Sequence, residues 1–404
     1  MRCFRRRGGT TMTWKEEITD LMTKATSRVE DVIDVMWRKT SERLGWDKPE
    51  VIVAFMGYAD HEQVRVRGRV LANAPHGGPQ EDDTWWTNLA ETYRRIASRE
   101  IPDIEVELAY GGMTQTVRTD EEGYYFATFP RRHERTRGLR WRGVHARTKR
   151  GENEAESSHR VLFPGDAARY LVVSDLDDTV IETGITSLLL MARLTFLSNA
   201  RTRSALPGVQ ALYEAFRWDA APKAERPGAG INPIFYVSNG PWNLYDLLRD
   251  FLEVNRIPEG PIFLQDWGFD DDKLVKPPGN RHKIERITQL LRSYPDLPTV
   301  LLGDSGEHDA STYVEIARKH PGRVRAIYIR DVDPGLLSQK DEVVEEVAKE
   351  AEKIGVPLLS GESSVRFAEH AASIGLIPEG AVESVKREAG RDLSRASLGS
   401  ETIG

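Results

Sequence analysis

The pattern of apolar and polar residues changes between the two halves of the chain. Between residues 51 and 159 the two kinds alternate, as in the run Gln63–Leu71, where valines and arginines take turns. A period of two is typical of antiparallel strands that bury one face. Between residues 170 and 329, short continuous apolar runs instead alternate with helical patterns, which is typical of parallel strands buried on both faces. We therefore predict a β-rich part followed by an α/β part.

The α/β part is predicted from four apolar runs rich in Val, Ile and Leu. As strands they are Tyr170–Ser174, Ile234–Val237, Thr299–Leu302 and Arg325–Ile329. Between them, apolar residues at helical spacing mark helices at Trp242–Leu252, Lys283–Arg292 and Ser311–Lys319. Strands and helices in alternation predict a doubly wound α/β fold with a parallel sheet, and we place this domain at residues 165–335.

The remaining segments are assigned from the same patterns. Residues 50–160 are predicted to form a small antiparallel, sandwich-like domain, interrupted by a helix near Leu89–Ser98. Within residues 1–45 the apolar positions predict an amphipathic helix, which its many acids make better suited to packing on a neighbouring domain than to lying on a membrane. Further helices are expected in residues 336–380. Residues 381–404 are polar and lack a clear period, so we predict a disordered tail.

Composition narrows the class of protein. Of the 404 residues, 39% are hydrophobic and 29% are charged, which provides for packed cores and excludes disorder throughout. Lys and Arg number 56 against 63 Asp and Glu, so the net charge is −7 and a generally basic nucleic-acid binder is not expected. The single cysteine, Cys3, excludes an internal disulfide and a zinc site of several cysteines. Without an apolar run of the ~18 residues that span a bilayer, and without a secretory signal, we expect a cytoplasmic protein that is at most peripheral to a membrane.

One segment of the β-rich part, residues 131–150, is strongly basic. The simplest interpretation is a solvated loop and edge strand. A second is contact with anionic lipid headgroups, to which each basic residue near the surface would contribute ~1 kcal/mol. Contact with nucleic acid is the third. The pattern alone leaves these interpretations open, and nothing in the β-rich part names a protein partner.

Polar and acidic residues follow three of the four predicted parallel strands. The first strand runs into Asp175-Leu-Asp-Asp-Thr179, and the second ends at Ser238-Asn239-Gly240. The third ends at Asp304, with Asp309 close behind. Because ligands of doubly wound folds bind at the carboxyl ends of the strands, we expect these side chains to meet at one rim of the sheet.

These residue types are suited to phosphoryl transfer. Converging carboxylates repel one another unless a cation lies among them, and an incomplete set of oxygen ligands suits Mg²⁺ completed by water and a substrate phosphate. One carboxylate can act as nucleophile through an aspartyl-phosphate, and a second, two residues along, can protonate the leaving oxygen and then activate water. Pro241 favours a helix start after the second strand, with backbone N–H groups facing an anion. A lysine is then needed to neutralise charge in the transition state.

The motifs resemble those of a known superfamily. Asp-x-Asp-x-Thr, a Ser after the second strand, a downstream Lys and Gly-Asp-x-x-x-x-Asp are similar to the four motifs of the haloacid dehalogenase superfamily of phosphatases. Four stretches narrow the resemblance to the catalytic domain of the actin-patch-associated phosphatidate phosphatases, which are relatives of the lipins: Ser174–Gly184, Tyr236–Trp242, His282–Lys283 and Leu302–Asp309. The resemblance covers roughly residues 168–332 and implies a haloacid-dehalogenase-like fold for the α/β domain.

The resemblance also implies a role for each matching residue. Asp175 would be the nucleophile and a Mg²⁺ ligand, and Asp177 the general acid and base that also touches the metal through its carbonyl. Lys283 would stabilise the aspartyl-phosphate, and it is preferred to Lys273 and Lys276 because it opens a helix just before the third strand. Thr179, Ser238, Asn239 and Gly240 would form a phosphate-binding set. Asp304 would hold Mg²⁺ directly, and Asp309 would do so through a water molecule or from the second shell of the metal.

The activity that the resemblance implies is a Mg²⁺-dependent phosphatase converting phosphatidate to diacylglycerol and phosphate at a membrane surface. Only a small insertion, which includes Ile185–Leu197, separates the first two strands, so a bulky or membrane-embedded substrate can reach the site. One alternative keeps the chemistry but acts on a phosphoprotein or a soluble phosphate ester. Another is a non-catalytic lipid-binding module, against which the presence of both Asp175 and Asp177 argues.

Overall fold

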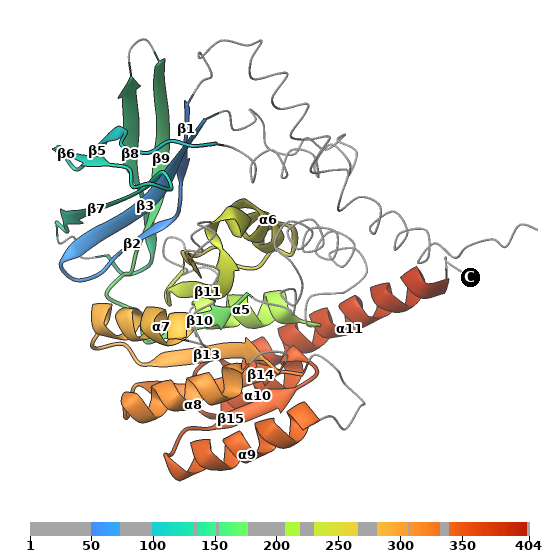
Figure 1. The fold of residues 1–404 in the computed structure, drawn as a ribbon. Coiled ribbons are helices and arrows are strands. Elements are labelled where there is room, and N and C mark those ends of the chain that lie inside the picture. Colours follow the sequence, from blue (N-terminus) through green and yellow to red (C-terminus); the bar gives the residue numbers. More distant parts are fainter. Residues whose placement is uncertain are drawn as a thin grey trace, which may run out of the picture. The chain divides into compact units, whose positions relative to one another are not determined.

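The structure is a computed structural model of the 404-residue chain. It describes residues 50–72, 99–132, 136–150, 153–176, 207–218, 230–265, 281–305, 308–331 and 339–401. Pro49–Gly404 forms one compact unit, and its described residues contain two sheets (Figure 1). The helices predicted within residues 1–45 and 89–98, and the insertion at 185–197, lie outside the described residues.

The first sheet is built from the β-rich part. Its described strands are β1 (Glu50–Ala54), β2 (Gly57–Ala59), β3 (Gln63–Ala72), β4 (Arg99–Glu100), β5 (Glu105–Tyr110), β6 (Met113–Arg118), β7 (Tyr124–Pro130), β8 (Arg140–Arg150) and β9 (Asn153–Phe163). They follow the order β1-β3-β2-β9-β8-β5-β6, with β4 and β7 also paired to β3. Neighbours are antiparallel except β2 and β9, which run parallel. The antiparallel prediction is corrected to a mixed sheet, because a period of two reports which face is buried and not the direction of the neighbour.

Alternate residues of these strands build one core. Val64 and Val66 of β3 are buried in the same cluster as Leu108 of β5. The intervening Arg65 and Arg67 belong to the opposite face of β3 because successive side chains of a strand point to opposite sides. The period of two that predicted strands in this part is therefore confirmed.

Part of the basic segment 131–150 is engaged within the protein. The Arg131 guanidinium donates hydrogen bonds to the carbonyl oxygens of Asp60, at 2.7 Å, and Pro164, at 3.3 Å. The Arg147 guanidinium, on β8, lies 2.5 Å from a carboxylate oxygen of Glu107 on β5. These contacts show that the segment is partly held by ion pairs and hydrogen bonds within the protein. The expected edge strand is corrected, because β8 pairs with β9 on one side and with β5 on the other and is therefore an inner strand of the sheet.

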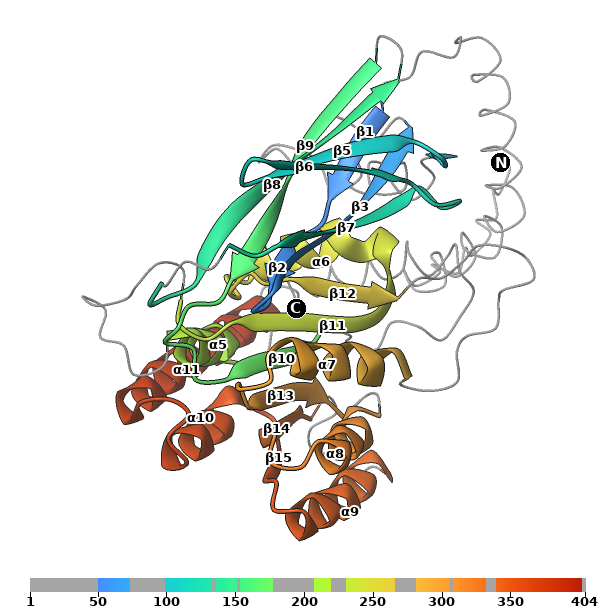
Figure 2. The same ribbon diagram turned by 90° about the vertical axis from the view of Figure 1, so that its left-hand side faces the viewer.

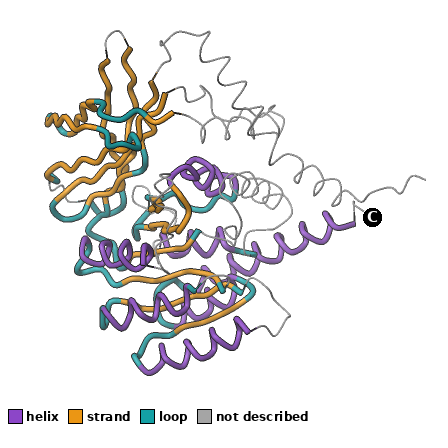
Figure 3. The backbone as a smooth tube through the Cα atoms, in the orientation of Figure 1, coloured by secondary structure: helices purple, strands orange, loops and turns teal. Residues whose placement is uncertain are grey.

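The second sheet is parallel throughout its described residues. Its strands are β10 (Leu171–Asp175), β11 (Ile234–Pro241), β12 (Ile262–Gln265), β13 (Thr299–Asp304), β14 (Val324–Arg330) and β15 (Leu358–Gly361), in the order β12-β11-β10-β13-β14-β15. The helices between and after them are α5 (Val209–Trp218), α6 (Tyr245–Val254), α7 (Arg281–Ser293), α8 (Asp309–Lys319), α9 (Gln339–Lys353), α10 (Ser364–Ser373) and α11 (Glu379–Glu401). Figure 3 shows this alternation of strand and helix along the chain.

Helices cover both faces of the parallel sheet (Figure 2). On one face α7, α8 and α9 pack against the sheet, and Ile287 of α7 shares a cluster with Val173 and Phe235. On the other face α5, α6, α10 and α11 pack, and Phe367 of α10 shares a cluster with Tyr236. Consecutive strand residues are thus buried on opposite faces, which explains the continuous apolar runs. None of the helices described is both long and apolar enough to cross a membrane.

Two predictions about this sheet and its flank are corrected. The four expected strands are joined by β12 and β15, which form the edges of the described sheet and have only four residues each, too few to show a period. The disordered tail expected at residues 381–404 is instead helical through most of its length, as α11. Three residues at helical spacing are buried there, namely Val382, Val385 and Ala389. The contact of α11 with α5 is partly polar, because Glu388 and Asp392 accept hydrogen bonds from backbone amides at the start of α5. Few apolar residues are therefore needed on α11, and the apolar stripe is narrow.

Candidate active site

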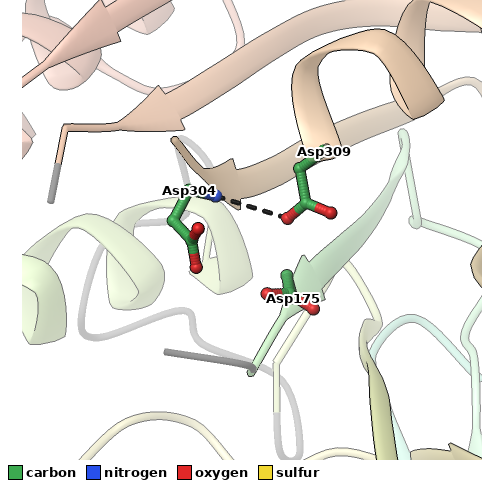
Figure 4. Close-up of side chains that lie close together, drawn as sticks. All are labelled: Asp175, Asp304 and Asp309. Carbon is green, nitrogen blue, oxygen red and sulfur yellow. Dashed lines mark hydrogen bonds between the residues drawn. The ribbon is translucent and has the colours of Figure 1, made fainter. Parts of the chain in front are cut away.

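Three aspartates meet where the order of the parallel strands reverses. After β10 the chain builds β11 and β12 on one side, and it begins again with β13 on the other. Asp175 ends β10, Asp304 ends β13 and Asp309 opens α8. One carboxylate oxygen of each lies within 4.8 Å of the other two (Figure 4). In doubly wound sheets this switch point, outside the carboxyl ends of the strands, is where ligands bind.

The aspartates are withdrawn from solvent. The side chain of Asp175 is 2% exposed, Asp304 is 6% exposed and Asp309 is fully buried. Burying several carboxylates together is unfavourable unless positive charge or hydrogen bonds compensate them. The surroundings of this cluster must therefore supply that compensation.

A buried lysine supplies part of it. Lys283 lies in the first turn of α7 and is fully buried. Its ammonium nitrogen is 2.7 Å from Oδ1 of Asp175 and 2.7 Å from Oδ1 of Asp309. Lys273 and Lys276, the other lysines considered from the sequence, lie outside the described residues. When ionised, three carboxylates and one ammonium leave two negative charges in excess, so the cluster is suited to holding a divalent cation through carboxylate oxygens.

Gly303 makes the close approach of Asp309 possible. A Cβ on residue 303 would lie 2.4 Å from Oδ2 of Asp309 and 2.8 Å from a ring carbon of Tyr313. The backbone N–H of Asp304 donates a 3.3 Å hydrogen bond to the same Oδ2. The Gly-Asp pair at the end of β13 therefore lets α8 begin against the strand, with the Asp309 carboxylate held beside Asp304.

Ser238, Asn239 and Gly240 lie at the end of β11, the strand beside β10. Ser238 is buried, and its Oγ accepts a 2.9 Å hydrogen bond from the backbone N–H of Gly240. Pairing with β12 is irregular between Val237 and Pro241, so this stretch departs from the regular ladder. Such a bulge turns backbone and side-chain polar groups out of the sheet.

The expected helix start at Pro241 is corrected. β11 continues through Pro241, a single 3₁₀ turn covers Trp242–Leu244, and α6 begins at Tyr245. Leu244 stands at the N-cap position, where a leucine side chain has no acceptor for the first amides of the helix. Proline is compatible with an irregular strand end as well as with the first position of a helix. Here Pro241 occupies the irregular end of β11.

Two buried tyrosines near the aspartates, Tyr213 and Tyr313, were not identified as site residues from the sequence. The hydroxyls of Tyr213 and Ser174 lie 2.6 Å apart, and Ser174 Oγ donates to the carbonyl of Asp175 at 2.8 Å. Burial, followed by the nearby Asp175 charge, raises the pKa of Tyr213 to about 12. Burial and the Asp309 charge raise the pKa of Tyr313 well above its ordinary value, and its hydroxyl donates to the carbonyl of Leu302 at 2.9 Å. On their helices both tyrosines occupy apolar-face positions, so the pattern marks them only as core residues.

Two of the sequence-derived candidates, Asp177 and Thr179, lie outside the described residues, and their roles stay predictions. Asp175, Lys283, Asp304 and Asp309 are brought together in one cluster. Ser238, Asn239 and Gly240 follow on the adjacent strand.

Comparison with known proteins bears on the same segment. Residues 170–331 match the family described as "Phosphatidate phosphatase APP1, catalytic domain". The predicted resemblance is confirmed. Over 199 residues the chain is 31% identical to "Phosphatidate phosphatase APP1" of Saccharomyces cerevisiae, a match covering 48% of this chain and 32% of that protein. Over 163 residues it is 29% identical to "Uncharacterized protein C29B5.04c" of Schizosaccharomyces pombe, covering 40% of this chain and 25% of that protein. The chain thus spans about a third or less of the length of these curated relatives.

Solved structures are similar only at a low level. A carbohydrate acetylesterase from Xanthomonas citri matches with a TM-score of 0.28 and 12% identity, over 82% of this chain and 71% of that chain. A sialyltransferase from Photobacterium damsela matches with a TM-score of 0.20 and 9% identity, over 80% of this chain and 49% of that chain. Neither similarity is close enough to bear on the fold or the function.

Proposed function

We propose that this chain is a Mg²⁺-dependent phosphatase of the haloacid dehalogenase type, which hydrolyses phosphatidate to diacylglycerol and phosphate. The observation that carries the proposal is the buried cluster of Asp175, Asp304, Asp309 and Lys283 at the switch point of the parallel sheet. This cluster lies within the segment that matches the APP1 catalytic domain. Both lines of support concern the same four residues.

In the proposed reaction Asp175 is the nucleophile. Its carboxylate attacks the phosphorus, the ester P–O bond breaks, and Asp177 gives a proton to the leaving oxygen. The products of this step are diacylglycerol and an aspartyl-phosphate. Water then attacks the phosphorus while Asp177 accepts its proton, which releases phosphate and regenerates the Asp175 carboxylate. The Lys283 ammonium, 2.7 Å from Oδ1 of Asp175, would offset the negative charge gathered in both steps.

The metal in this proposal is held by Asp175, Asp304 and Asp309. Their oxygen donors and their two uncompensated negative charges fit a small divalent cation that prefers carboxylates and water. When bound, Mg²⁺ would neutralise the phosphoryl oxygens and orient the phosphate for attack. Asp177 is proposed to add its backbone carbonyl to the metal ligands.

Phosphate recognition is assigned to the end of β11 and to Thr179. The hydroxyl of Ser238 and the backbone amides of the irregular stretch Ser238–Gly240 would bind the phosphoryl oxygens that do not react. Ser238–Gly240 follows Val237, the residue paired with Asp175 in the ladder between β10 and β11. The nucleophile and the phosphate-binding groups are therefore adjacent at one edge of the sheet.

The lipid substrate is proposed from the match to the APP1 family, together with the small insertion between the first two strands of the α/β domain. We also propose that the enzyme is a cytoplasmic, peripheral protein that acts at the surface of an anionic membrane, since phosphatidate is a membrane lipid. A phosphoprotein or a soluble phosphate ester would use the same chemistry, so the substrate must be tested directly.

The test is phosphate release by the full chain from phosphatidate in detergent micelles, with Mg²⁺ or with EDTA. Wild type is compared with Asp175→Asn and with Asp296→Asn, an aspartate 85% exposed on its side chain. We expect Mg²⁺-dependent release that falls at least ~10³-fold in Asp175→Asn and is unchanged in Asp296→Asn. Release from a soluble ester or a phosphopeptide but not from phosphatidate would refute the lipid substrate. No release from any of the three would refute the phosphatase.

A further inference from the structure

Residues of the β-rich part contact the indole that follows the phosphate-binding stretch. Phe55, between β1 and β2, stacks on Trp242 with ring centroids 4.4 Å apart and planes inclined by 29°. The Arg67 guanidinium, on β3, lies 4.6 Å from the centroid of Trp242 and 4.6 Å from that of Tyr124 on β7. We call Phe55, Arg67 and Tyr124 the Trp242 clamp.

The clamp extends to the start of α6. Tyr245, the first residue of that helix, packs against Phe55 with ring centroids 4.6 Å apart. Its hydroxyl accepts a 2.7 Å hydrogen bond from the backbone N–H of Met56. Trp242, Tyr245 and Phe55 are all buried, so the contact is a packed one. Because Leu244 offers no side-chain cap, these contacts contribute to holding the beginning of α6.

The stretch Ser238–Gly240 lies between two positions that neighbouring elements fix. Upstream, Val237 is paired on both sides, with Asp175 of β10 and with Phe263 of β12. From there to Pro241 the ladder with β12 is irregular. Ser238, Asn239 and Gly240 therefore lie between a regularly paired residue and the clamped Trp242, so the position of Trp242 sets one end of this stretch.

The same corner of the β-rich part also contacts the helix that carries Lys283. Tyr58 of β2 packs on Phe235 and Tyr294, with ring centroids 5.7 and 6.4 Å apart. The hydroxyl of Tyr294, just after α7, donates a 2.9 Å hydrogen bond to the carbonyl of Ala59. A single short segment, residues 55–59, thus contacts both the β11 turn and the end of α7.

We propose that Phe55 and Arg67 are positioning residues: by holding Trp242 they fix the backbone of Ser238–Gly240 in the geometry that binds a phosphoryl group. This inference rests on the proposed function, in which that stretch binds the phosphate. It also assigns a role to the β-rich part, which would set the geometry of the phosphate-binding stretch Ser238–Gly240 from outside the α/β domain.

The test compares the full-chain wild type with Arg67→Gln and Phe55→Leu. Each variant weakens the clamp, since glutamine lacks the cation and leucine lacks the ring. Arg67→Lys keeps a cation over the indole and should restore part of the effect. The matched control is Arg160→Gln, which removes another guanidinium–indole contact of the β-rich part, 4.8 Å from the centroid of Trp141, together with a surface ion pair to Glu259.

The first readout is amide hydrogen exchange of residues 238–245, which needs no activity. We expect exchange there to become about fivefold faster in Arg67→Gln and Phe55→Leu, and to stay at the wild-type rate in Arg160→Gln. Wild-type rates in both clamp variants would overturn the inference, whatever the protein's activity. Equal acceleration in Arg160→Gln would also overturn it, because the effect would then be general loosening.

The second readout separates positioning from a merely structural role. A misplaced phosphate-binding stretch should raise KM and the inhibition constant of inorganic phosphate about fivefold, with kcat changed less than twofold. Faster exchange without a change in either constant would overturn the positioning role. A wild type that releases no phosphate from any substrate would instead refute the proposed function, and the exchange readout would still decide whether the clamp holds the turn.

Discussion

Removing the Lys283 ammonium should lower the stability of the protein and make it depend more strongly on Mg²⁺. The side chain is fully buried, and its nitrogen lies 2.7 Å from carboxylate oxygens of both Asp175 and Asp309. Lys283→Met keeps the apolar stem and removes the charge. Breaking a buried ion pair by removing one partner costs about 3–5 kcal/mol. At about 2–4 °C per kcal/mol for a domain of this size, the unfolding midpoint in EDTA should fall by about 10 °C.

Adding Mg²⁺ should recover much of this loss. The carboxylates of Asp175, Asp304 and Asp309 are left without their ammonium in the variant, so a divalent cation relieves more repulsion there than in wild type. The rise of the midpoint on adding Mg²⁺ should therefore be larger for Lys283→Met than for wild type, although the variant stays inactive because transition-state charge is no longer offset.

Scanning calorimetry of the full chain, in EDTA and in Mg²⁺, measures both effects. Lys386→Met is the matched control, since that exposed lysine also lies between two carboxylates, 3.0 Å from Glu369 and 3.7 Å from Glu383. Its removal should leave the midpoint unchanged within error, because exposed pairs are screened by water. If Lys283→Met unfolds at the wild-type temperature in EDTA, the ammonium does not compensate the aspartates and the argument for the cluster is wrong.

Three further predictions follow from individual contacts. Gly303→Ala should lower kcat/KM at least ~10-fold, because its Cβ would displace the Asp309 carboxylate that lies 2.4 Å away; unchanged phosphate release would contradict this. Asp304→Asn should raise the Mg²⁺ concentration needed for half-maximal activity about tenfold, and an unchanged Mg²⁺ titration would remove this residue from the ligand set. Burial lowers the pKa of His159 to about 4 from 6.5. Between these pH values the unfolded state therefore binds a proton at this histidine and the folded state does not. Its contribution, about 3 kcal/mol, is present above pH 6.5 and lost as the pH falls toward 4, so calorimetry should show a steeper decline of stability between pH 7 and 5 in wild type than in His159→Gln.

Much of the fold could be predicted because its patterns are periodic. The continuous runs at Val172 and Ile234 identify strands buried on both faces, and alternation around Val64 identifies strands with one buried face. Short edge strands such as β12 carry too few residues for a period to show. The helix α11 was not predicted, because Glu388 and Asp392 look like surface residues when only the sequence is considered. In the structure both accept hydrogen bonds from backbone amides at the start of α5.

The candidate site was predictable to the extent that topology determines it. Strand ends in a parallel sheet meet at one edge, so Asp175 and Asp304 could be expected to lie together. The position of Lys283 between Asp175 and Asp309 depends on how α7 packs, and spacing alone left other lysines open. Tyr213 and the Trp242 clamp arise from contacts between segments far apart in the chain, for which a single sequence carries no local signal.

The central claim, that Asp175 carries the phosphoryl group during turnover, is open to direct measurement. The full chain would be mixed with Mg²⁺ and phosphatidate micelles, quenched in acid within one turnover, digested and examined by mass spectrometry. The account predicts one phosphoryl group on Asp175 in wild type, which disappears in EDTA and in Asp175→Asn. Phosphate release with the phosphoryl group on another residue, or undiminished release by Asp175→Asn, would contradict it.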